Sequence, residues 1–428
     1  MRRLFSILSL SLLVSTAAAQ PRLPVKDGAR ILFLGDSNTF AGGFITYLDA
    51  FLFARFPDRK LELINLGLPS ETVSGLSEPD HPYPRPNVHD RLEAALKKTK
   101  PDLVVACYGM NDGIYYPFAK ERLEKFEQGY GRLIARVLKD KVPLVILTPM
   151  PFDAAALKGK LAPKGEPKYS WLKPYEGYDV VLAVYSEWLR EMKKPAGVQV
   201  VDVHQEAIDA LRLIRGFKDK GFILSGDGIH PGPLGHLLAA GALGRALGLF
   251  EPEPAAELEA REGTVVAGPL KNVRSSADQT QWTWDMGLAL PYEPAWKFGV
   301  EDNSTVRALA KGPVLKITGL PWKKARLFEG EKFLGEVEAD KDGSFTIVPY
   351  RFPNFSRFKD SQEFMKAVRD RQRLLGLAWL TDVGHKRPDT PKGAPLDEAK
   401  KKAAALEERI RALARRREAT LSLTPILK

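Results

Sequence analysis

Cysteine is nearly absent from this sequence, which has one, Cys107, among 428 residues. A single thiol cannot form a disulfide within the chain, so a disulfide-stabilised scaffold is excluded. A chain of this length can bury a large apolar core and does not need such cross-links. Cys107 itself stands in the apolar run DLVVACYGM, which favours a buried structural thiol over a nucleophile.

Long apolar runs are also absent, and none is long enough to span a bilayer as a helix. The most apolar segment is at the N-terminus, where Arg2 and Arg3 precede an apolar stretch at 4–14 and three alanines at 17–19. This order of positive, apolar and small residues is typical of a signal peptide. We therefore predict a signal peptide over residues 1–19 and an exported chain, periplasmic or extracellular in a bacterium.

Acidic residues are outnumbered, because 53 Asp and Glu face 64 Lys and Arg, for a formal net charge of +11. Solvated basic surfaces explain such an excess, and affinity for a polyanion such as an acidic glycan is the alternative. No nucleic-acid-binding motif is recognisable, and export also argues against that partner. The His and Asp residues of DHPYPRPNVHD lack the regular spacing of metal ligands, so we expect neither a metal nor another cofactor.

From residue 30 to about 250 the sequence alternates regularly between short apolar runs and helical patterns. The apolar runs are RILFLG, LELINLG, DLVVACYG, VPLVILTP and VQVVDV. Continuous apolar strands separated by amphipathic helices are typical of a parallel sheet covered on both faces. We predict one doubly wound, flavodoxin-like α/β domain over residues 20–250. Two long loops in it, 66–88 and 149–177, follow strand ends, where open α/β sheets bind their ligands.

The alternation stops after residue 250. We interpret 251–312 as an irregular linker and 313–428 as a smaller C-terminal extension. Within the extension VLKITGL, KARLFEGEKFLGEVEAD and GSFTIVPY alternate at period two, which predicts a small antiparallel β unit. Helices are expected over 357–377 and within LDEAKKKAAALEERIRALARRREATLSL, whose apolar stripe favours packing on the β unit. A coiled-coil partner for this last helix is the alternative.

Three side chains near predicted strand and helix ends fit acyl transfer. Ser37 follows the first strand in GDSN, and the loop GDGIHP contains Asp227 and His230. A serine hydroxyl becomes a good nucleophile when a neutral histidine accepts its proton. A carboxylate that accepts from the other ring nitrogen holds the histidine in one tautomer. We predict Ser37 as the nucleophile, His230 as its base and Asp227 as the orienting acid, although Ser37 taken alone would more often be a helix cap.

Attack on a carbonyl also creates an oxyanion, which N–H donors must stabilise. In a flavodoxin-like sheet Gly67 and Asn111, which follow the second and third strands, lie close to Ser37. The backbone N–H groups of Ser37 and Gly67 and the side-chain amide of Asn111 are the predicted donors. Gly67 lacks a side chain, which would let a substrate approach its backbone. Asp36 and Asp112 are expected to bind turn backbone rather than to take part in the reaction.

Four segments together resemble motif blocks of the SGNH hydrolases, also called GDSL-type esterases and lipases. The segments are FLGDSNTF, INLGLPSETV, CYGMNDG and SGDGIHPGPLGH, and the resemblance covers residues 30–248. It implies a flavodoxin-like fold and an acyl-enzyme mechanism that needs no cofactor. It also implies the same site residues in the same roles, namely Ser37, Gly67, Asn111, Asp227 and His230.

Asn38 departs from the family pattern, in which many members have Leu or Ile at this position. Because Asn38 follows the nucleophile, we expect the change to alter the pocket and to leave the mechanism intact. The stretch SGLSEPDHPYPRPNVHDRL also resembles an envelope-associated subgroup, whose members often carry a C-terminal β-and-helix extension.

Asn38, Arg85 and Tyr175 are the candidate substrate contacts. Arg85 would clamp an anionic or hydroxylated substrate, unless it is an ordinary exposed loop residue. Tyr175, together with Trp171 and Tyr178, would form a sugar-stacking platform or would hold its own loop. The choice between these roles depends on which of the side chains are exposed beside Ser37.

These features predict an exported serine ester hydrolase that removes short acyl groups, acetyl above all, from carbohydrate. The loops are polar and aromatic, with no obvious apolar lid for long acyl chains. A lipase or lysophospholipase and a sugar O-acyltransferase are alternatives with the same chemistry. A non-catalytic glycan-binding protein on a hydrolase scaffold is an alternative of another class, since fold alone does not establish activity. A metal-dependent phosphoesterase is a third.

Overall fold

The computed structural model describes residues 26–249 continuously and several segments of the remainder, namely 256–259, 264–267, 271–276, 280–286, 288, 315–348, 352–415 and 417–426. The predicted signal peptide at 1–19 lies outside the described residues and stays a prediction. Across the described segments, no helix combines the length and apolar character needed to cross a membrane.

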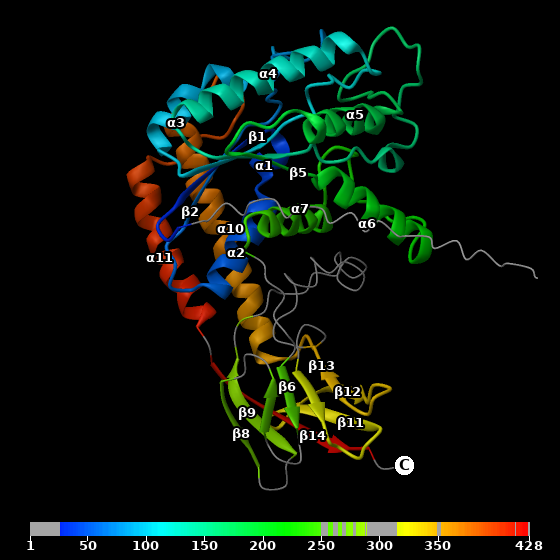
Figure 1. Ribbon diagram of the computed structural model, residues 1–428, viewed down its shortest axis with the longest axis vertical. Helices are drawn as coiled ribbons and strands as arrows, with labels where there is room; N and C mark the ends of the chain where they lie inside the picture. Colours follow the sequence, from blue (N-terminus) through cyan, green and yellow to red (C-terminus); the bar gives the residue numbers. More distant parts are fainter. Residues whose placement is uncertain are drawn as a thin grey trace, which may run out of the picture.

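The α/β domain is built on a five-stranded parallel sheet in the order β2-β1-β3-β4-β5 (Figure 1). Its strands are β1 (Arg30–Gly35), β2 (Glu62–Gly67), β3 (Leu103–Cys107), β4 (Leu144–Leu147) and β5 (Val198–Val201). In register, Gly35 at the end of β1 lies opposite Gly67 of β2 and Cys107 of β3. This strand order is flavodoxin-like and confirms the predicted fold. It also places the switch point at the carboxyl ends of β1 and β3.

Successive side chains of β1 point into two separate cores, one on each face of the sheet. Ile31 and Phe33 lie in the core covered by α2, α6 and α7, whereas Leu32 and Leu34 lie in the core covered by α3, α4 and α5. Figure 1 shows these two helix layers on opposite sides of the sheet. The bounds are α2 (Gly43–Arg55), α6 (Val203–Phe217), α7 (Pro233–Ala246), α3 (Leu92–Thr99), α4 (Lys120–Lys139) and α5 (Tyr178–Glu191).

The two C-terminal helices, α10 (Ser356–Val383) and α11 (Leu396–Ala414), pack on the α/β domain. Phe364 of α10 and Ile410 of α11 are buried in the same core as α2, and Trp379 is buried in the core on the other face of the sheet. Figure 1 shows α10 running beside β2 and α2. The prediction that the last helix packs on the β unit is therefore wrong. Instead α10 covers β2, whose open edge would otherwise be free to pair with another chain, and α11 packs on α10 and α2.

The remaining strands form two sheets around a separate core. One sheet has the order β13-β10-β6-β7 and the other β12-β11-β14-β9-β8. The bounds are β6 (Ala256–Glu259), β7 (Thr264–Ala267), β8 (Lys271–Ser275), β9 (Gln281–Met286), β10 (Leu315–Thr318), β11 (Lys324–Glu329), β12 (Lys332–Glu338), β13 (Phe345–Ile347) and β14 (Arg417–Pro425). Trp282, Leu327 and Phe345 are fully buried between the sheets.

This β unit differs from the sequence prediction at both ends. The described parts of segment 251–312, expected to be an irregular linker, contribute four strands, and β6 pairs with β10 in parallel. The final helical pattern ends at Ala414, and β14 follows it and pairs with β9 and β11. Leu421 and Leu423 of β14 alternate with more exposed residues, which is the period of a strand. The strands of the β unit therefore come from both sides of residue 312, and α10 and α11 stand between β13 and β14 in the sequence.

Candidate active site

Ser37 lies at the carboxyl end of β1, where the chain turns sharply into the short helix α1 (Ser37–Ala41). Asp36 caps this helix, because its Oδ1 accepts from the Asn38 N–H at 2.9 Å. Gly35 makes the turn fit: a Cβ there would lie 2.1 Å from Thr39 Oγ1 and 2.7 Å from the Cys107 carbonyl oxygen. The strand-to-helix turn thus holds Ser37 half-buried at the switch point.

The loop before α7 brings His230 and Asp227 to Ser37. His230 Nε2 is 2.8 Å from Ser37 Oγ, and His230 Nδ1 is 2.6 Å from Asp227 Oδ2. Burial acts to raise the pKa of Asp227, but hydrogen bonds from the His230 ring and from the N–H groups of His230 and Ile229 outweigh it and lower this pKa to about 2. An ionised carboxylate only accepts, so Nδ1 carries the proton and Nε2 is left to accept from the serine hydroxyl.

An ion pair between buried Asp153 and half-buried Arg215 braces this loop from outside. Arg215 Nη2 donates to both carboxylate oxygens of Asp153, at 2.7 and 2.8 Å. The Asp153 N–H donates to the Gly228 carbonyl at 2.9 Å, and Asp153 Oδ2 accepts from the Leu224 N–H at 2.8 Å. Sequence reasoning missed Asp153, since its partner Arg215 is 62 positions away and no spacing links the two.

Asn111 follows β3 and is held at both ends of its amide. Its Nδ2 donates to the Glu71 carbonyl at 3.2 Å, and its Oδ1 accepts from the Tyr115 hydroxyl at 3.0 Å. Because an amide nitrogen has two hydrogens, one donor stays available for a ligand. The neighbouring Asp112 accepts from the N–H groups of Val73 and Ser74, as expected of a residue that binds turn backbone. Burial raises the pKa of Asp112 to about 6 and that of Asp36 to about 7.

Gly67 is the site residue at which the structure departs from the sequence prediction. Its N–H donates to Asn65 Oδ1 at 2.9 Å and is therefore already occupied. A Cβ on Gly67 would lie 2.2 Å from the Phe40 nitrogen, so the missing side chain makes room for α1 and not for a substrate. Three positions later, Ser70 has φ 66, in the left-handed region. Its N–H has no acceptor within the described part of the chain. No sequence signal marked Ser70 as an N–H donor, because the direction of this N–H depends on a backbone dihedral.

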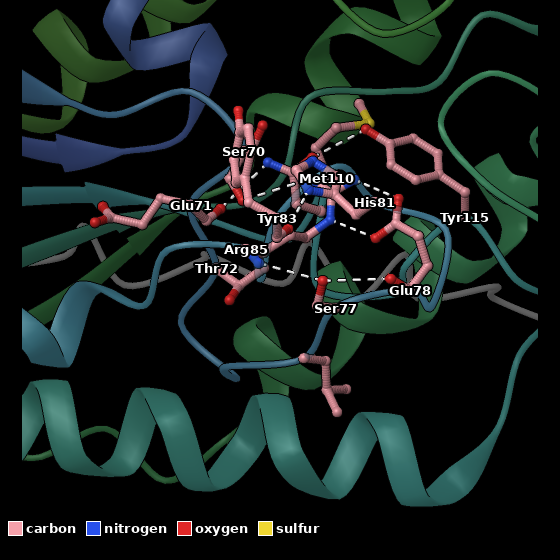
Figure 2. Close-up of polar contacts among 12 residues, drawn as sticks. Ser70, Glu71, Thr72, Ser77, Glu78, His81, Tyr83, Arg85, Met110 and Tyr115 are labelled. Atoms are coloured by element: carbon pink, nitrogen blue, oxygen red, sulfur yellow. Dashed lines mark hydrogen bonds and ion pairs between the residues drawn. The ribbon is translucent and has the colours of Figure 1, made fainter. Parts of the chain in front are cut away.

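The three candidate substrate contacts are more enclosed than expected. Arg85 is buried, and its Nε and Nη2 each donate to the Glu78 carboxylate at 2.6 Å (Figure 2). It is therefore neither an exposed loop residue nor a guanidinium that is free to bind a substrate. Asn38 is buried in α1, and its Oδ1 lacks a hydrogen-bond partner among the described residues. Tyr175 is half-buried, and its N–H donates to the Tyr115 carbonyl at 3.0 Å. Its ring meets Tyr169 edge-on, so Tyr175 holds its own loop.

Other titratable groups near the sheet have structural partners. Asp202 caps α6 by accepting from the Gln205 N–H, and buried His204 lies 3.2 Å from Asp179 Oδ1. Burial lowers the pKa of His236 to about 4, where it packs against Phe44. Within the described segments, no group of three or more His, Cys, Asp or Glu side chains could hold a metal ion.

Comparison with known proteins identifies the α/β domain. Residues 33–238 match the family model described as the GDSL-like Lipase/Acylhydrolase family. No curated protein matches the sequence. Among solved structures, BT4096, a gut microbial diltiazem-metabolizing enzyme, has a TM-score of 0.72 and 17% identity, over 95% of this chain and 100% of its own. That likeness shows a common fold that includes the C-terminal extension.

Shorter proteins match about half of this chain. Axe2, an acetylxylan esterase from Geobacillus stearothermophilus, is 22% identical and covers 54% of this chain and 98% of its own, with a TM-score of 0.36. A putative lipolytic protein of the G-D-S-L family from Desulfitobacterium hafniense is 18% identical over 51% of this chain and 99% of its own, with a TM-score of 0.33. The family match confirms the resemblance of the four motifs: the domain at residues 33–238 is of the GDSL-like Lipase/Acylhydrolase family, and the chain is a carboxylic ester hydrolase.

Proposed function

We propose that this member of the GDSL-like family is an exported serine esterase that removes short acyl groups, chiefly acetyl, from carbohydrate. The observation that carries the serine mechanism is the hydrogen-bond chain from Ser37 Oγ to His230 Nε2, at 2.8 Å, and from His230 Nδ1 to Asp227 Oδ2, at 2.6 Å. The three side chains meet at the ligand-binding end of the sheet, and each is at least partly accessible to a substrate.

The reaction follows from the proton positions. As Ser37 Oγ forms a bond to the ester carbonyl carbon, its proton passes to His230 Nε2, and the carbonyl π electrons move to the oxygen. Asp227 stabilises the resulting imidazolium. When the tetrahedral intermediate collapses, the bond to the alcohol oxygen breaks and Nε2 protonates that oxygen. Water then repeats the same steps on the acyl-enzyme and releases the carboxylic acid together with free Ser37.

The oxyanion would be bound by the N–H of Ser37, the N–H of Ser70 and the amide of Asn111, with Ser70 taking the place of Gly67. Ser37 is the first residue of α1, so its N–H has no acceptor within the helix. Ser70 and Asn111 lie together, since Asn111 Nδ2 contacts the carbonyl of Glu71, the residue after Ser70. Three preorganised donors of this kind are what a tetrahedral oxyanion needs.

The substrate class is inferred from the loop that follows β4. Trp171 is 41% exposed and Leu172 67% exposed, at the end of a loop with several lysines. An exposed indole beside polar side chains suits the face of a sugar. A lipase or lysophospholipase would use the same exposed Leu172, together with Phe118, which is 47% exposed, for an acyl chain. Chain-length preference therefore separates the two functions.

The test is hydrolysis of p-nitrophenyl acetate, butyrate and octanoate, and acetate release from acetylated xylan, by the wild type and by Ser37→Ala. We expect the acetyl ester to be preferred, acetate to be released from the polysaccharide, and Ser37→Ala to be inactive on all substrates. A preference for octanoate with no acetate release would support the lipase instead. Wild-type rates equal to those of Ser37→Ala would support a glycan-binding protein.

A further inference from the structure

Arg85 lies at the centre of a buried polar network behind the proposed oxyanion site (Figure 2). The side chains of Arg85 and Glu78 are 2% and 0% exposed, and two hydrogen bonds of 2.6 Å join them. A buried ion pair of this kind adds little net stability compared with apolar side chains of similar volume, because both charges must leave water. Its placement beside the site therefore calls for another explanation.

The first link from Arg85 runs to Ser70. Arg85 Nη1 donates to the Ser70 carbonyl at 3.4 Å. A left-handed backbone is unfavourable for serine, so φ 66 persists only where neighbouring groups hold it. The direction of the Ser70 N–H depends on that dihedral. Arg85 thus acts on one proposed oxyanion donor through the carbonyl of the same residue.

The second link runs to Asn111 through Tyr115. The Arg85 guanidinium lies 5.5 Å from the centre of the Tyr115 ring, and the Tyr115 hydroxyl donates to Asn111 Oδ1 at 3.0 Å. The Glu71 carbonyl decides which end of the amide faces it, since a flipped amide would set two acceptors against each other, and the Tyr115 hydroxyl holds the Oδ1 end in place. The orientation of Asn111 therefore depends on the position of the Tyr115 ring.

We propose that Arg85 is a positioning residue that aligns the Ser70 and Asn111 donors with the developing oxyanion, while Glu78 fixes its guanidinium. This inference rests on the proposed function. Only a planar fork can hold Glu78 through two nitrogens and reach the Ser70 carbonyl with a third. Misalignment would weaken binding of the transition state and leave binding of the neutral ester largely unchanged.

The test compares Arg85→Lys with Arg371→Lys, which alters an equally buried Arg–Asp pair in α10, away from Ser37. We expect Arg85→Lys to lower kcat for p-nitrophenyl acetate about 100-fold, the loss that follows a misplacement of about 1 Å. KM should change less than about threefold, since ground-state binding is retained. Arg371→Lys should lower the melting temperature to a similar extent and leave kcat of the folded protein unchanged.

Two further measurements exclude a merely structural role. Tyr115→Phe keeps the ion pair and removes only the donor to Asn111, so kcat should fall about tenfold and the double variant should lose less than the product of the two effects. Inhibition by phenylboronic acid, whose adduct places a hydroxyl at the oxyanion position, should weaken in parallel with kcat/KM.

The results that would overturn the proposal are specific. They are equal kcat for Arg85→Lys and Arg371→Lys, or a loss that lies in KM alone. If Arg85→Lys does not fold, an unchanged kcat for Tyr115→Phe overturns the proposal. Retained activity of Ser37→Ala would instead refute the proposed function, whatever Arg85 does, so the two failures are distinguishable.

Discussion

Arg371 of α10 donates to Asp49 of α2 at 3.2 Å, across 322 positions of the sequence. Gln372 donates to the same carboxylate oxygen at 2.6 Å, and all three side chains are buried. The C-terminal helices therefore complete the core of the hydrolase domain, in addition to connecting it to the β unit. Removal of the C-terminal helices should therefore affect the hydrolase domain itself.

Removing residues 352–428 should leave no folded hydrolase. Phe364, Val368 and Ile410 would be lost from one core and Trp379 from the other. Burial of each such side chain stabilises by about 1.5–3 kcal/mol, which together approaches the whole free energy of unfolding of a domain. Soluble yield and thermal melting of the truncated chain measure the outcome. A soluble truncated protein with the melting temperature of the full chain would contradict this role for α10 and α11.

Asp227→Asn should lower kcat by about 10³ to 10⁴ while the fold is kept, because an amide does not hold the His230 tautomer that accepts the serine proton. Steady-state hydrolysis of p-nitrophenyl acetate gives kcat, and circular dichroism checks the fold. Asp202→Asn, which alters the cap of α6 and the contacts of that carboxylate with Thr148 and Arg190, is the matched control and should keep kcat. An Asp227→Asn rate close to that of the control would remove Asp227 from the mechanism.

Asp36→Asn should raise stability at neutral pH. Burial raises the pKa of Asp36 from 3.8 to about 7, so the folded protein binds a proton that the unfolded chain releases between those values. The stabilising contribution is present in full below pH 3.8 and is lost as pH rises toward 7. Asparagine still accepts from the Asn38 N–H but does not ionise.

Thermal melts of wild type and Asp36→Asn between pH 4 and 8 test this sign. The difference in unfolding free energy should grow with pH by a few kcal/mol at most, since one pKa unit corresponds to about 1.4 kcal/mol. Asp102→Asn, at an exposed carboxylate, is the control. A wild type that gains stability over Asp36→Asn as pH rises would show that Asp36 ionises readily.

Arg215→Met should loosen the loop that carries His230. It breaks the double contact to Asp153, whose backbone and carboxylate hold Gly228 and Leu224. A loss of roughly 2–3 kcal/mol in unfolding free energy is expected for an unpaired buried carboxylate. Denaturant unfolding measures that loss, and kcat should fall with it. Unchanged kcat in the folded variant would show that the loop holds its shape without the brace.

Gly35→Ala and Gly131→Ala should have opposite effects. A Cβ at Gly35 would lie 2.7 Å from the Cys107 backbone oxygen, whereas one at Gly131, in α4, would meet nothing within 4 Å. The first substitution should displace Ser37 and abolish activity, and the second should stabilise by about 0.5–1 kcal/mol. Melting temperatures and esterase rates of the two variants test this prediction. Normal activity in Gly35→Ala would show that the strand end can shift without cost.

Much of the site could be predicted from the sequence because it depends on strand order. Once the sheet is flavodoxin-like, Ser37 and Asn111 necessarily follow adjacent strands, and Asp227 and His230 are linked by their own loop. Ser70 could not be predicted, because its candidate role depends on a positive φ and on an N–H left free by its neighbours. Residue type carries neither property.

The fold could be predicted about as completely as the site, and again only where it depends on a pattern in the sequence. Apolar periodicity shows that the helix around Ile410 has a buried face, but it does not show which surface that face contacts. The burial of Arg85 was not foreseen, since an arginine in a Pro-rich loop is ordinarily exposed. Its partner Glu78 is only seven positions away, but the loop that encloses both forms only in the folded chain.

The position of β14 bears on how the protein is made. This strand lies in the middle of its sheet, between β11 and β9, yet it is synthesised after every other strand of that sheet. While the ribosome is still adding residues before Arg417, β9 and β11 have unpaired edges and Trp282 lacks its cover. The β unit must therefore close after translation has passed this point. A partner that keeps nascent chains apart would matter most during that interval.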